Sequence, residues 1–305
     1  MMNKVIKIGT RDSQLALWQA HTVQDKLQAL GYSTKIVSVK SQGDLKLDTP
    51  LYELGITGVF TKILDVAMLN NTVDIAVHSL KDVPTALPKG IVQGAVLNRA
   101  STQDILVTKQ AIDLSKPCTI ATGSLRRKAQ WLHQYPNHTV VNLRGNVNTR
   151  LQKLQDNPWQ GAIFAKAGLE RIKVLPKNYT NLYWMTPAPA QGAMVVVGLQ
   201  DDLFCLQAIE KLNHAPSQIC TQIERDFLRT LEGGCTAPIG ALAKIEGDTI
   251  QFVGSLFSLD GTKKVAIEKT ISLHLASTAG EAIAKELLQR GADVLLKEIK
   301  ERMNL

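Results

Sequence analysis

The chain has 305 residues, of which 45% are hydrophobic, 20% charged and 5% aromatic. This composition is typical of a folded globular protein and excludes a disordered tail, a collagen-like chain and a small disulfide-rich scaffold. At roughly 100–200 residues per domain, the length predicts two or three domains. Lysine and arginine exceed aspartate and glutamate by 35 to 27. This excess favours an anionic partner, which could be nucleic acid, a lipid surface or an acidic small molecule.

Short β-rich runs alternate with helical patterns through the first two thirds of the chain. Helices are expected after Ser13, from about residue 60 to 68, and at Leu125–Tyr135 and Val147–Gln155. This alternation predicts mostly parallel, doubly wound sheets. Strands are expected at Val5–Ile8, Lys35–Val39, Asp74–His78, Asp104–Thr108, Thr119–Thr122, Thr139–Leu143, Gly161–Ala165 and Ala193–Gly198.

The pattern changes at about Pro216. One helix is expected through Leu231, then three strand-like stretches, then a helix at Ala279–Arg290. Strands followed by a helix predict a small α+β domain. We therefore expect an α/β protein with two doubly wound lobes and a smaller third domain.

Targeting and metal-binding signals are missing from the sequence. The N-terminus has no apolar stretch with a cleavage site, and no run approaches the roughly 18 apolar residues of a membrane helix. The four cysteines form no C-x-x-C pair, so no metal is expected. Cys118, Cys205 and Cys220 lie in apolar segments typical of a core. We expect a reduced, cytosolic, soluble protein.

Polar residues follow the expected strand Asp74–His78, where the sequence reads His-Ser-Leu-Lys-Asp-Val-Pro. Ligands of open α/β sheets bind outside the carboxyl ends of the strands. Asp82, next to Lys81, is therefore a candidate general acid/base or cation stabiliser. The alternative is a solvated turn that Pro84 terminates.

Several arginines occupy equivalent positions after expected strands. Arg11, the pair Arg126 and Arg127, Arg144, and Arg150 one helical turn later all fit this description. Arginine binds carboxylate or phosphate in a bidentate manner, and helix N-termini favour anions. The pattern predicts a ligand with several negative charges, although any single arginine could simply lie at the surface.

Nucleic acid and nucleotides are disfavoured as that ligand. The chain has no helix-turn-helix signature, no RNP-type aromatic motif and no basic tail. Neither phosphate-binding glycine motif, G-x-x-x-x-G-K-[ST] or G-x-G-x-x-G, occurs in it.

Cys235 follows two glycines in a segment expected to be a loop. A loop cysteine can be a nucleophile or a covalent anchor when cations favour its thiolate, or it can have no role.

These stretches together resemble the porphobilinogen deaminase (hydroxymethylbilane synthase) family over essentially the whole chain. The resemblance implies two periplasmic-binding-protein-like lobes and a small α+β C-terminal domain. The implied domains are residues 1–97 with 193–213, residues 98–192, and residues 214–305. The motifs that carry the resemblance are Ile8–Arg11, Leu15–Ala20, Asp74–Pro84, Ser124–Arg127, Leu143–Val147 and Leu231–Cys235.

The resemblance implies a transferase that condenses four porphobilinogen molecules head to tail and releases four ammonia molecules. The chain would grow on a covalent dipyrromethane cofactor, one per protein, joined to Cys235 by a thioether, and hydrolysis would free hydroxymethylbilane. The implied protein is a cytoplasmic monomer of porphyrin, tetrapyrrole and heme biosynthesis, which binds neither nucleic acid nor membranes. Its product would pass to uroporphyrinogen-III synthase.

The resemblance also assigns roles to residues. Asp82 matches the catalytic aspartate, which would stabilise the azafulvenium cation left when ammonia departs and would shuttle protons. The cofactor-binding positions are Lys81, Ser124, Arg126, Arg127, Arg144 and Arg150, and the substrate-binding positions are Arg11, Ser13, Gln19 and Arg171.

The chain departs from the family pattern at several positions. Thr57 and Ile63 stand where the family has a lysine and a glutamate, and this bears on a lid-like loop. Ala190 replaces the first glycine of a Gly-Gln-Gly motif. Two alternatives stay open, a divergent paralogue without turnover and a two-lobed binding protein for an anionic small molecule.

Overall fold

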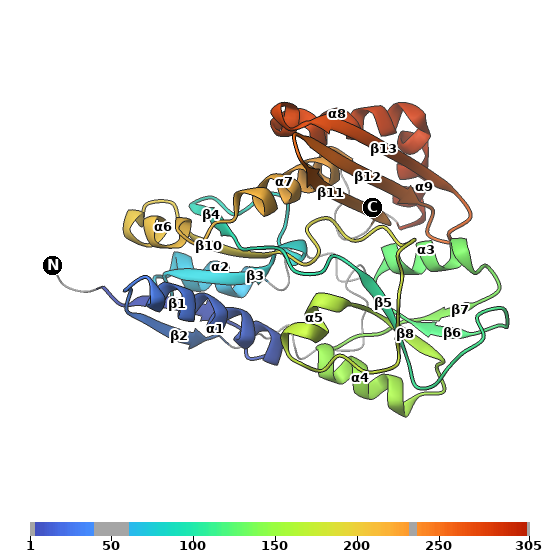
Figure 1. Ribbon diagram of the computed structural model, residues 1–305, viewed down its shortest axis with the longest axis horizontal. Helices are drawn as coiled ribbons and strands as arrows, with labels where there is room; N and C mark the ends of the chain where they lie inside the picture. The colour runs from blue at the N-terminus through green and yellow to red at the C-terminus, as the bar shows by residue number, and fades with distance from the viewer. Residues whose placement is uncertain (1–3, 40–60, 232–236, 304–305) are drawn as a thin grey trace.

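The computed structural model describes residues 4–39, 61–231 and 237–303. They form two α/β lobes side by side and a smaller C-terminal unit above them (Figure 1). The C-terminal unit contacts both lobes, since Arg225 donates to the Val83 carbonyl of lobe 1 and His133 of lobe 2 is bonded to the Gly261 carbonyl. The expected α/β architecture of two lobes and a smaller domain is confirmed.

Lobe 1 is a sheet with the strand order β2-β1-β3-β10-β4. Buried residues of α1 and α6 pack on one face of this sheet, and those of α2 pack on the other. The elements of lobe 1 are β1 (Ile6–Thr10), α1 (Gln14–Ala29), β2 (Thr34–Ser38), α2 (Lys62–Leu69), β3 (Ile75–Ser79), the 3₁₀ turn η3 (Leu80–Asp82), β4 (Ile91–Val96), β10 (Met194–Leu199) and α6 (Leu203–Glu210).

Lobe 2 is a sheet with the strand order β7-β6-β8-β5-β9. Leu154 of α4 and Leu169 of α5 pack on one face, and Trp131 of α3 packs on the other. The elements of lobe 2 are β5 (Asp104–Thr108), β6 (Thr119–Ala121), α3 (Leu125–Gln134), β7 (Thr139–Val141), α4 (Val147–Asp156), β8 (Gly161–Ala165), α5 (Lys166–Arg171) and β9 (Tyr179–Asn181).

Both sheets are mostly parallel, as expected, and each contains one strand that runs against the other four. In lobe 1, β1 pairs parallel with β2 and β3, whereas β10 runs antiparallel to β3 and β4. In lobe 2, β6 pairs parallel with β7 and β8, whereas β5 runs antiparallel to β8 and β9. The antiparallel strands β5 and β10 are those with which the chain enters a sheet after crossing from the other lobe. They arrive without a helical crossover of their own lobe, which would have made them parallel.

The C-terminal unit is an antiparallel meander in the order β11-β12-β13, covered by helices. The expected final helix is α8, and after a break at Gly291 (φ 99°) a further helix, α9, follows that the sequence did not indicate. The elements are α7 (Ala215–Thr230), β11 (Ile239–Glu246), β12 (Thr249–Phe257), β13 (Lys264–Ser272), the 3₁₀ turn η4 (Leu273–Leu275), α8 (Ala276–Leu287), the π-helical turn η5 (Leu288–Ala292) and α9 (Asp293–Arg302).

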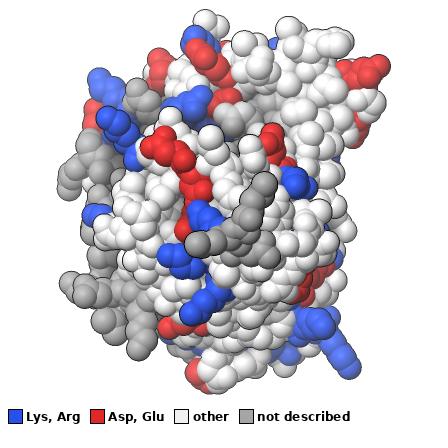
Figure 2. Space-filling model, turned by 90° about the vertical axis from the view of Figure 1, so that its left-hand side faces the viewer, with Lys and Arg blue, Asp and Glu red and all other residues white. Residues whose placement is uncertain are grey.

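Charged side chains of both signs share the end of the molecule formed by lobe 1 (Figure 2). On this face, lysines and arginines are interspersed with aspartates and glutamates rather than gathered in one stripe. This distribution does not resemble the continuous basic surface that nucleic acid requires. The positive charge that matters for function lies instead between the lobes.

Candidate active site

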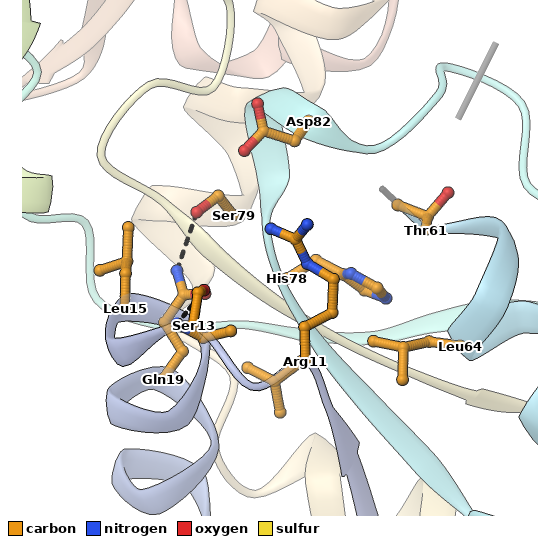
Figure 3. A pocket seen from close by; sticks show the side chains of 11 residues that line it. Arg11, Ser13, Leu15, Gln19, Thr61, Leu64, His78, Ser79 and Asp82 are labelled. Atoms are coloured by element: carbon orange, nitrogen blue, oxygen red, sulfur yellow. Dashed lines mark hydrogen bonds between the residues drawn. The ribbon is translucent and has the colours of Figure 1, made fainter. Parts of the chain in front are cut away.

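A pocket opens at the carboxyl ends of β1 and β3 (Figure 3). Arg11 lies over His78 in this view, and Asp82 lies above the guanidinium. Arg11, Ser13 and Gln19, to which the family resemblance assigns substrate binding, all line this pocket. The lining residues are Arg11, Ser13, Leu15, Ala16, Gln19, Thr61, Leu64, Val77, His78, Ser79 and Asp82.

Local sequence explains why these side chains face one another. Ser13 ends the connection from β1 and caps α1, because its hydroxyl accepts a bond from the Ala16 amide at 3.4 Å. The helix then brings Gln19 to the end of β3, where its Nε2 donates to the Ser79 hydroxyl at 2.8 Å. The strand–turn–helix order thus places the start of α1 beside the last residues of β3.

His78 is the unexpected member of the pocket. Its side chain is 7% exposed, and its Nε2 has no hydrogen-bond partner among the described residues. Burial, with the positive charge of Arg11 beside it, lowers the pKa of His78 to about 4. The imidazole is therefore neutral at physiological pH.

Asp82 lies on η3, directly after β3, and its carboxylate is exposed. The turn is tied to the neighbouring chain, because the Leu80 amide donates to the Ala193 carbonyl at 3.0 Å. Its charge also acts on Lys81 and Arg150, which do not line the pocket. Asp82 therefore lies between the pocket and a second group of charged residues.

That second group is a cluster of cations at the facing edge of lobe 2, and we call it the cation cluster. Ser124 caps α3 by accepting from the Arg127 amide at 3.4 Å, so the two arginines stand in the first turn of this helix. Lys81 reaches the cluster from lobe 1. The members are Lys81, Arg126, Arg127, Arg144 and Arg150.

A fully buried aspartate lies within the cation cluster. Arg126 Nη1 is 2.8 Å from Asp104 Oδ2, and Arg127 Nη2 is 2.8 Å from Oδ1. Burial by itself would raise the pKa of Asp104, but the two guanidiniums outweigh this effect and lower it to about 2. The pairing fixes both arginines, and two guanidiniums share a single negative charge.

The other three cations of the cluster, Lys81, Arg144 and Arg150, form no ion pair with a carboxylate of the described residues. Burial, together with Arg127, lowers the pKa of Lys81 to about 8, and the same causes lower that of Arg150 to about 10. Arg144 Nη1 and Arg126 Nε are buried without a hydrogen-bond partner in the described part of the chain. Buried guanidinium N–H groups without partners are costly, and the carboxylates of a polyanionic ligand would satisfy them.

Arg171 lies away from the pocket lining. Its guanidinium lies 5.6 Å from the ring centre of Trp18 on α1, and Nη2 donates to the Gly192 carbonyl at 2.7 Å. It therefore bridges lobe 2, α1 and the segment that returns to lobe 1. Cys235 and Thr57 are outside the described residues, and Ile63 lies in the first turn of α2.

Asp104, Gln191 and Arg225 are the residues of the site that the sequence did not reveal. Asp104 was noted only as the first residue of a strand, and Gln191 only in a departure from the family pattern. A fully buried aspartate or glutamine at a strand end or a chain crossing is recognised only when its partners are known. Their hydrogen bonds join positions 23 to 145 residues apart.

Comparisons with known proteins assign this arrangement to a family. Residues 6–207 match the family model "Porphobilinogen deaminase, dipyromethane cofactor binding domain", and residues 218–289 match "Porphobilinogen deaminase, C-terminal domain". The chain belongs to the porphobilinogen deaminase family. The porphobilinogen deaminase of Campylobacter fetus is 41% identical over 97% of this chain and 99% of its own. That of Campylobacter curvus is 39% identical over 99% and 100%.

Solved structures with a similar arrangement are more distant. A periplasmic substrate-binding protein from Coxiella burnetii covers 72% of this chain and 97% of its own at 14% identity, with a TM-score of 0.43. The methionine-binding protein MetQ covers 68% of this chain and 89% of its own at 12% identity, with a TM-score of 0.45. Among the helices of the described ranges, none has the length and apolar character to cross a membrane.

Proposed function

We propose that this member of the porphobilinogen deaminase family condenses four porphobilinogen molecules head to tail. Each step releases ammonia and extends a chain on the dipyrromethane cofactor, and hydrolysis then frees hydroxymethylbilane. The observation that carries the proposal is the position of Asp82, whose carboxylate lines the pocket and also acts on Lys81 and Arg150 of the cation cluster. A carboxylate at that boundary lies where an incoming substrate would meet a bound chain.

The two sides of Asp82 fit two ligands. On one side, Arg11, Ser13 and Gln19 line the pocket and would bind the incoming porphobilinogen. On the other side, the cation cluster with Ser124 would hold the cofactor. Every pyrrole of that cofactor carries an acetate and a propionate, and the unpaired N–H groups of Arg144 and Arg126 are donors for them.

The bound cofactor would supply the nucleophilic pyrrole carbon to which the first substrate is joined. Cys235 would hold it by a thioether and Arg171 would contact the substrate or the growing chain, as the family resemblance implies. The protein's own residues would orient and neutralise it, because burial and mutual repulsion depress the pKa values of Lys81 and Arg150. Bound carboxylates would relieve this repulsion, so the cation cluster is preorganised for anions.

Asp82 would act on charge and on protons. Departure of ammonia leaves a positive charge on the substrate's pyrrole, which a carboxylate near its N–H stabilises. The same carboxylate can pass a proton to the leaving amine and accept the one released when the new carbon–carbon bond forms. The carboxylate is exposed and can therefore contact a bound substrate, while the hydrogen bond from Leu80 to Ala193 holds the turn that carries it.

The organisation beyond the site is also part of the proposal. We assign residues 1–97 and 193–213, 98–192, and 214–305 to three domains, since the chain crosses between the lobes near Arg99 and Gln191. The family resemblance supports a cytoplasmic monomer that delivers its product to uroporphyrinogen-III synthase.

Replacement of Asp82 by asparagine tests the proposal. Asp82→Asn removes the charge and the proton acceptor at nearly constant shape, so turnover of porphobilinogen should fall by about 10²–10⁴-fold. The cofactor should stay attached, which intact mass measures. Asp12→Asn is the control, because Asp12 lies beside Arg11 but outside the pocket lining. Normal turnover by Asp82→Asn would refute the role, and no turnover by the wild type would favour the binding-protein alternative.

A further inference from the structure

Gln191 lies at the centre of the segment that returns the chain from lobe 2 to lobe 1, and it is fully buried. The residues on either side have left-handed backbones, with φ 62° at Ala190 and 85° at Gly192. A Cβ at Gly192 would come within 2.6 Å of the carbonyl oxygens of Ala100 and Ser101. The turn is therefore confined by the other crossing segment, and the position of Gln191 is fixed.

The side chain of Gln191 connects the two lobes. Its Nε2 donates to the Thr102 carbonyl at 2.8 Å and to Asp104 Oδ1 at 2.9 Å. Its Oε1 accepts from Lys81 Nζ at 3.2 Å. The carboxamide cannot rotate by 180°, because both partners of Nε2 are acceptors and Lys81 is a donor.

The backbone of Gln191 is held equally firmly. Its carbonyl accepts from Arg99 Nε at 2.9 Å, and the same guanidinium forms two bonds, of 2.6 and 2.9 Å, with Glu224 of α7. Its amide donates to the Ala188 carbonyl. Gln191 is thus bonded to lobe 1, to lobe 2 and, through Arg99, to the C-terminal unit.

We infer that Gln191 is a positioning residue that holds the ammonium group of Lys81 in place over the cofactor site. The inference rests on the proposed function, in which Lys81 binds cofactor and chain carboxylates. A lysine side chain has four rotatable bonds, and ordering it costs conformational entropy. A fixed neutral acceptor restrains Nζ through one N–H and leaves the others for the ligand.

The chemistry of the acceptor matters as much as its position. The charged groups around Lys81 are Asp82, Asp104, Arg126 and Arg127. Asp104 is already paired with the two arginines, and the carboxamide stands between it and Lys81. A carboxylate at position 191 would neutralise Lys81, whereas the amide orients it and leaves its full charge for the ligand.

A double-mutant cycle tests the inference. Gln191→Met removes the acceptor at similar volume, and the variants Gln191→Met, Lys81→Met and their combination are compared as holoenzymes. We expect Gln191→Met to lower kcat about tenfold with KM changed less than twofold, and to have less than a twofold effect in the Lys81→Met background. Equal effects in both backgrounds would overturn the inference, because a purely structural residue acts whether or not Lys81 is present. No effect of Lys81→Met by itself would instead refute the proposed role of Lys81.

A second variant keeps the inference testable if Gln191→Met does not fold. Gln191→Asn keeps the carboxamide but shortens the side chain by one methylene, so its oxygen should no longer reach Lys81 Nζ. Loss of a hydrogen bond that favours the charged form should lower the pKa of the Lys81 ammonium. The measurement is the pH dependence of acylation at Lys81, followed by peptide mass mapping, with exposed Lys177 of lobe 2 as the internal reference. An unchanged profile at Lys81 would contradict the contact.

Discussion

Single residues were predictable where their role is local. Ser13 and Ser124 cap helices as their position before apolar helical patterns indicates, and Gly31 takes the left-handed conformation (φ 87°) that ends α1. The roles of Asp104 and Gln191 depend on partners far away in the chain. No local pattern distinguishes a strand-terminal aspartate that neutralises two arginines from one that faces solvent.

His78 should make stability depend on pH. The folded protein holds a neutral imidazole whose pKa is lowered to about 4, whereas the unfolded chain takes up a proton near pH 6.5. Its contribution is complete above pH 6.5 and is lost as the pH falls towards 4, by about 3 kcal/mol. Urea unfolding at pH 7 and pH 4.5 should show a smaller loss of stability on acidification in His78→Gln than in the wild type.

His21→Gln is the matched control for that measurement, because His21 lies exposed on α1. Its loss of stability between pH 7 and 4.5 should equal that of the wild type. An equal loss in His78→Gln as well would show that the buried imidazole does not carry the effect.

Helices and strands were predictable where hydrophobic periodicity is strong. The expected strands Asp104–Thr108 and Gly161–Ala165 coincide with β5 and β8. No clear pattern indicated β4, β9, α5, α6 or α9, which are short or weakly patterned. The reversed direction of β5 and β10 was not predicted either, because it depends on which lobe the chain enters from.

One helix of the C-terminal unit supports the turn η3 of lobe 1, which carries Asp82. Arg225 of α7 donates to the carbonyls of Leu80, Val83 and Pro84, at 3.2, 2.9 and 2.6 Å. These carbonyls flank Lys81 and Asp82, so the guanidinium sets where the turn lies. Burial lowers the pKa of Arg225, but the side chain stays cationic because an arginine pKa starts above 12.

Arg225→Lys should therefore impair catalysis without abolishing the fold. A lysine ammonium lacks the planar fork and cannot reach the three carbonyls in the same geometry. Because small displacements of catalytic groups are costly, kcat should fall by about tenfold or more while cofactor loading, measured by intact mass, persists. Arg229→Lys, on the same helix and paired with Asp226 nearer the surface, should leave kcat unchanged. The same kcat in both variants would refute the support that Arg225 gives to the turn.

A buried ion pair links the C-terminal unit to both segments at which the chain crosses between the lobes. Glu224 is fully buried, forms a bidentate pair with Arg99, and accepts from the amides of Ala190 and Ala243 at 2.6 and 2.8 Å. Arg99 and Ala190 lie in the two segments at which the chain crosses between the lobes, and Ala243 lies in β11. The two-lobed architecture with a third domain was predictable from the order of elements, but this junction was not, because it depends on tertiary packing.

Arg99→Met should leave the Glu224 carboxylate buried and without its counter-ion. Removal of one partner from a buried pair costs about 3–5 kcal/mol, which urea denaturation would show as a lower unfolding midpoint. Arg290→Met breaks an exposed pair with Glu286 and should lower the unfolding midpoint much less than Arg99→Met does. Equal losses in the two variants would mean that the junction does not hold the domains together.

A dipyrromethane bound covalently to Cys235 would distinguish an active deaminase from a binding protein, and intact mass detects it. The purified protein should exceed its chain mass by two porphobilinogen-derived pyrrole units. Cys235→Ser should lose this excess, and Cys118→Ser, at a buried cysteine of lobe 2, should keep it. A bare chain mass that incubation with porphobilinogen does not increase would contradict the account, and so would an excess that Cys235→Ser retains.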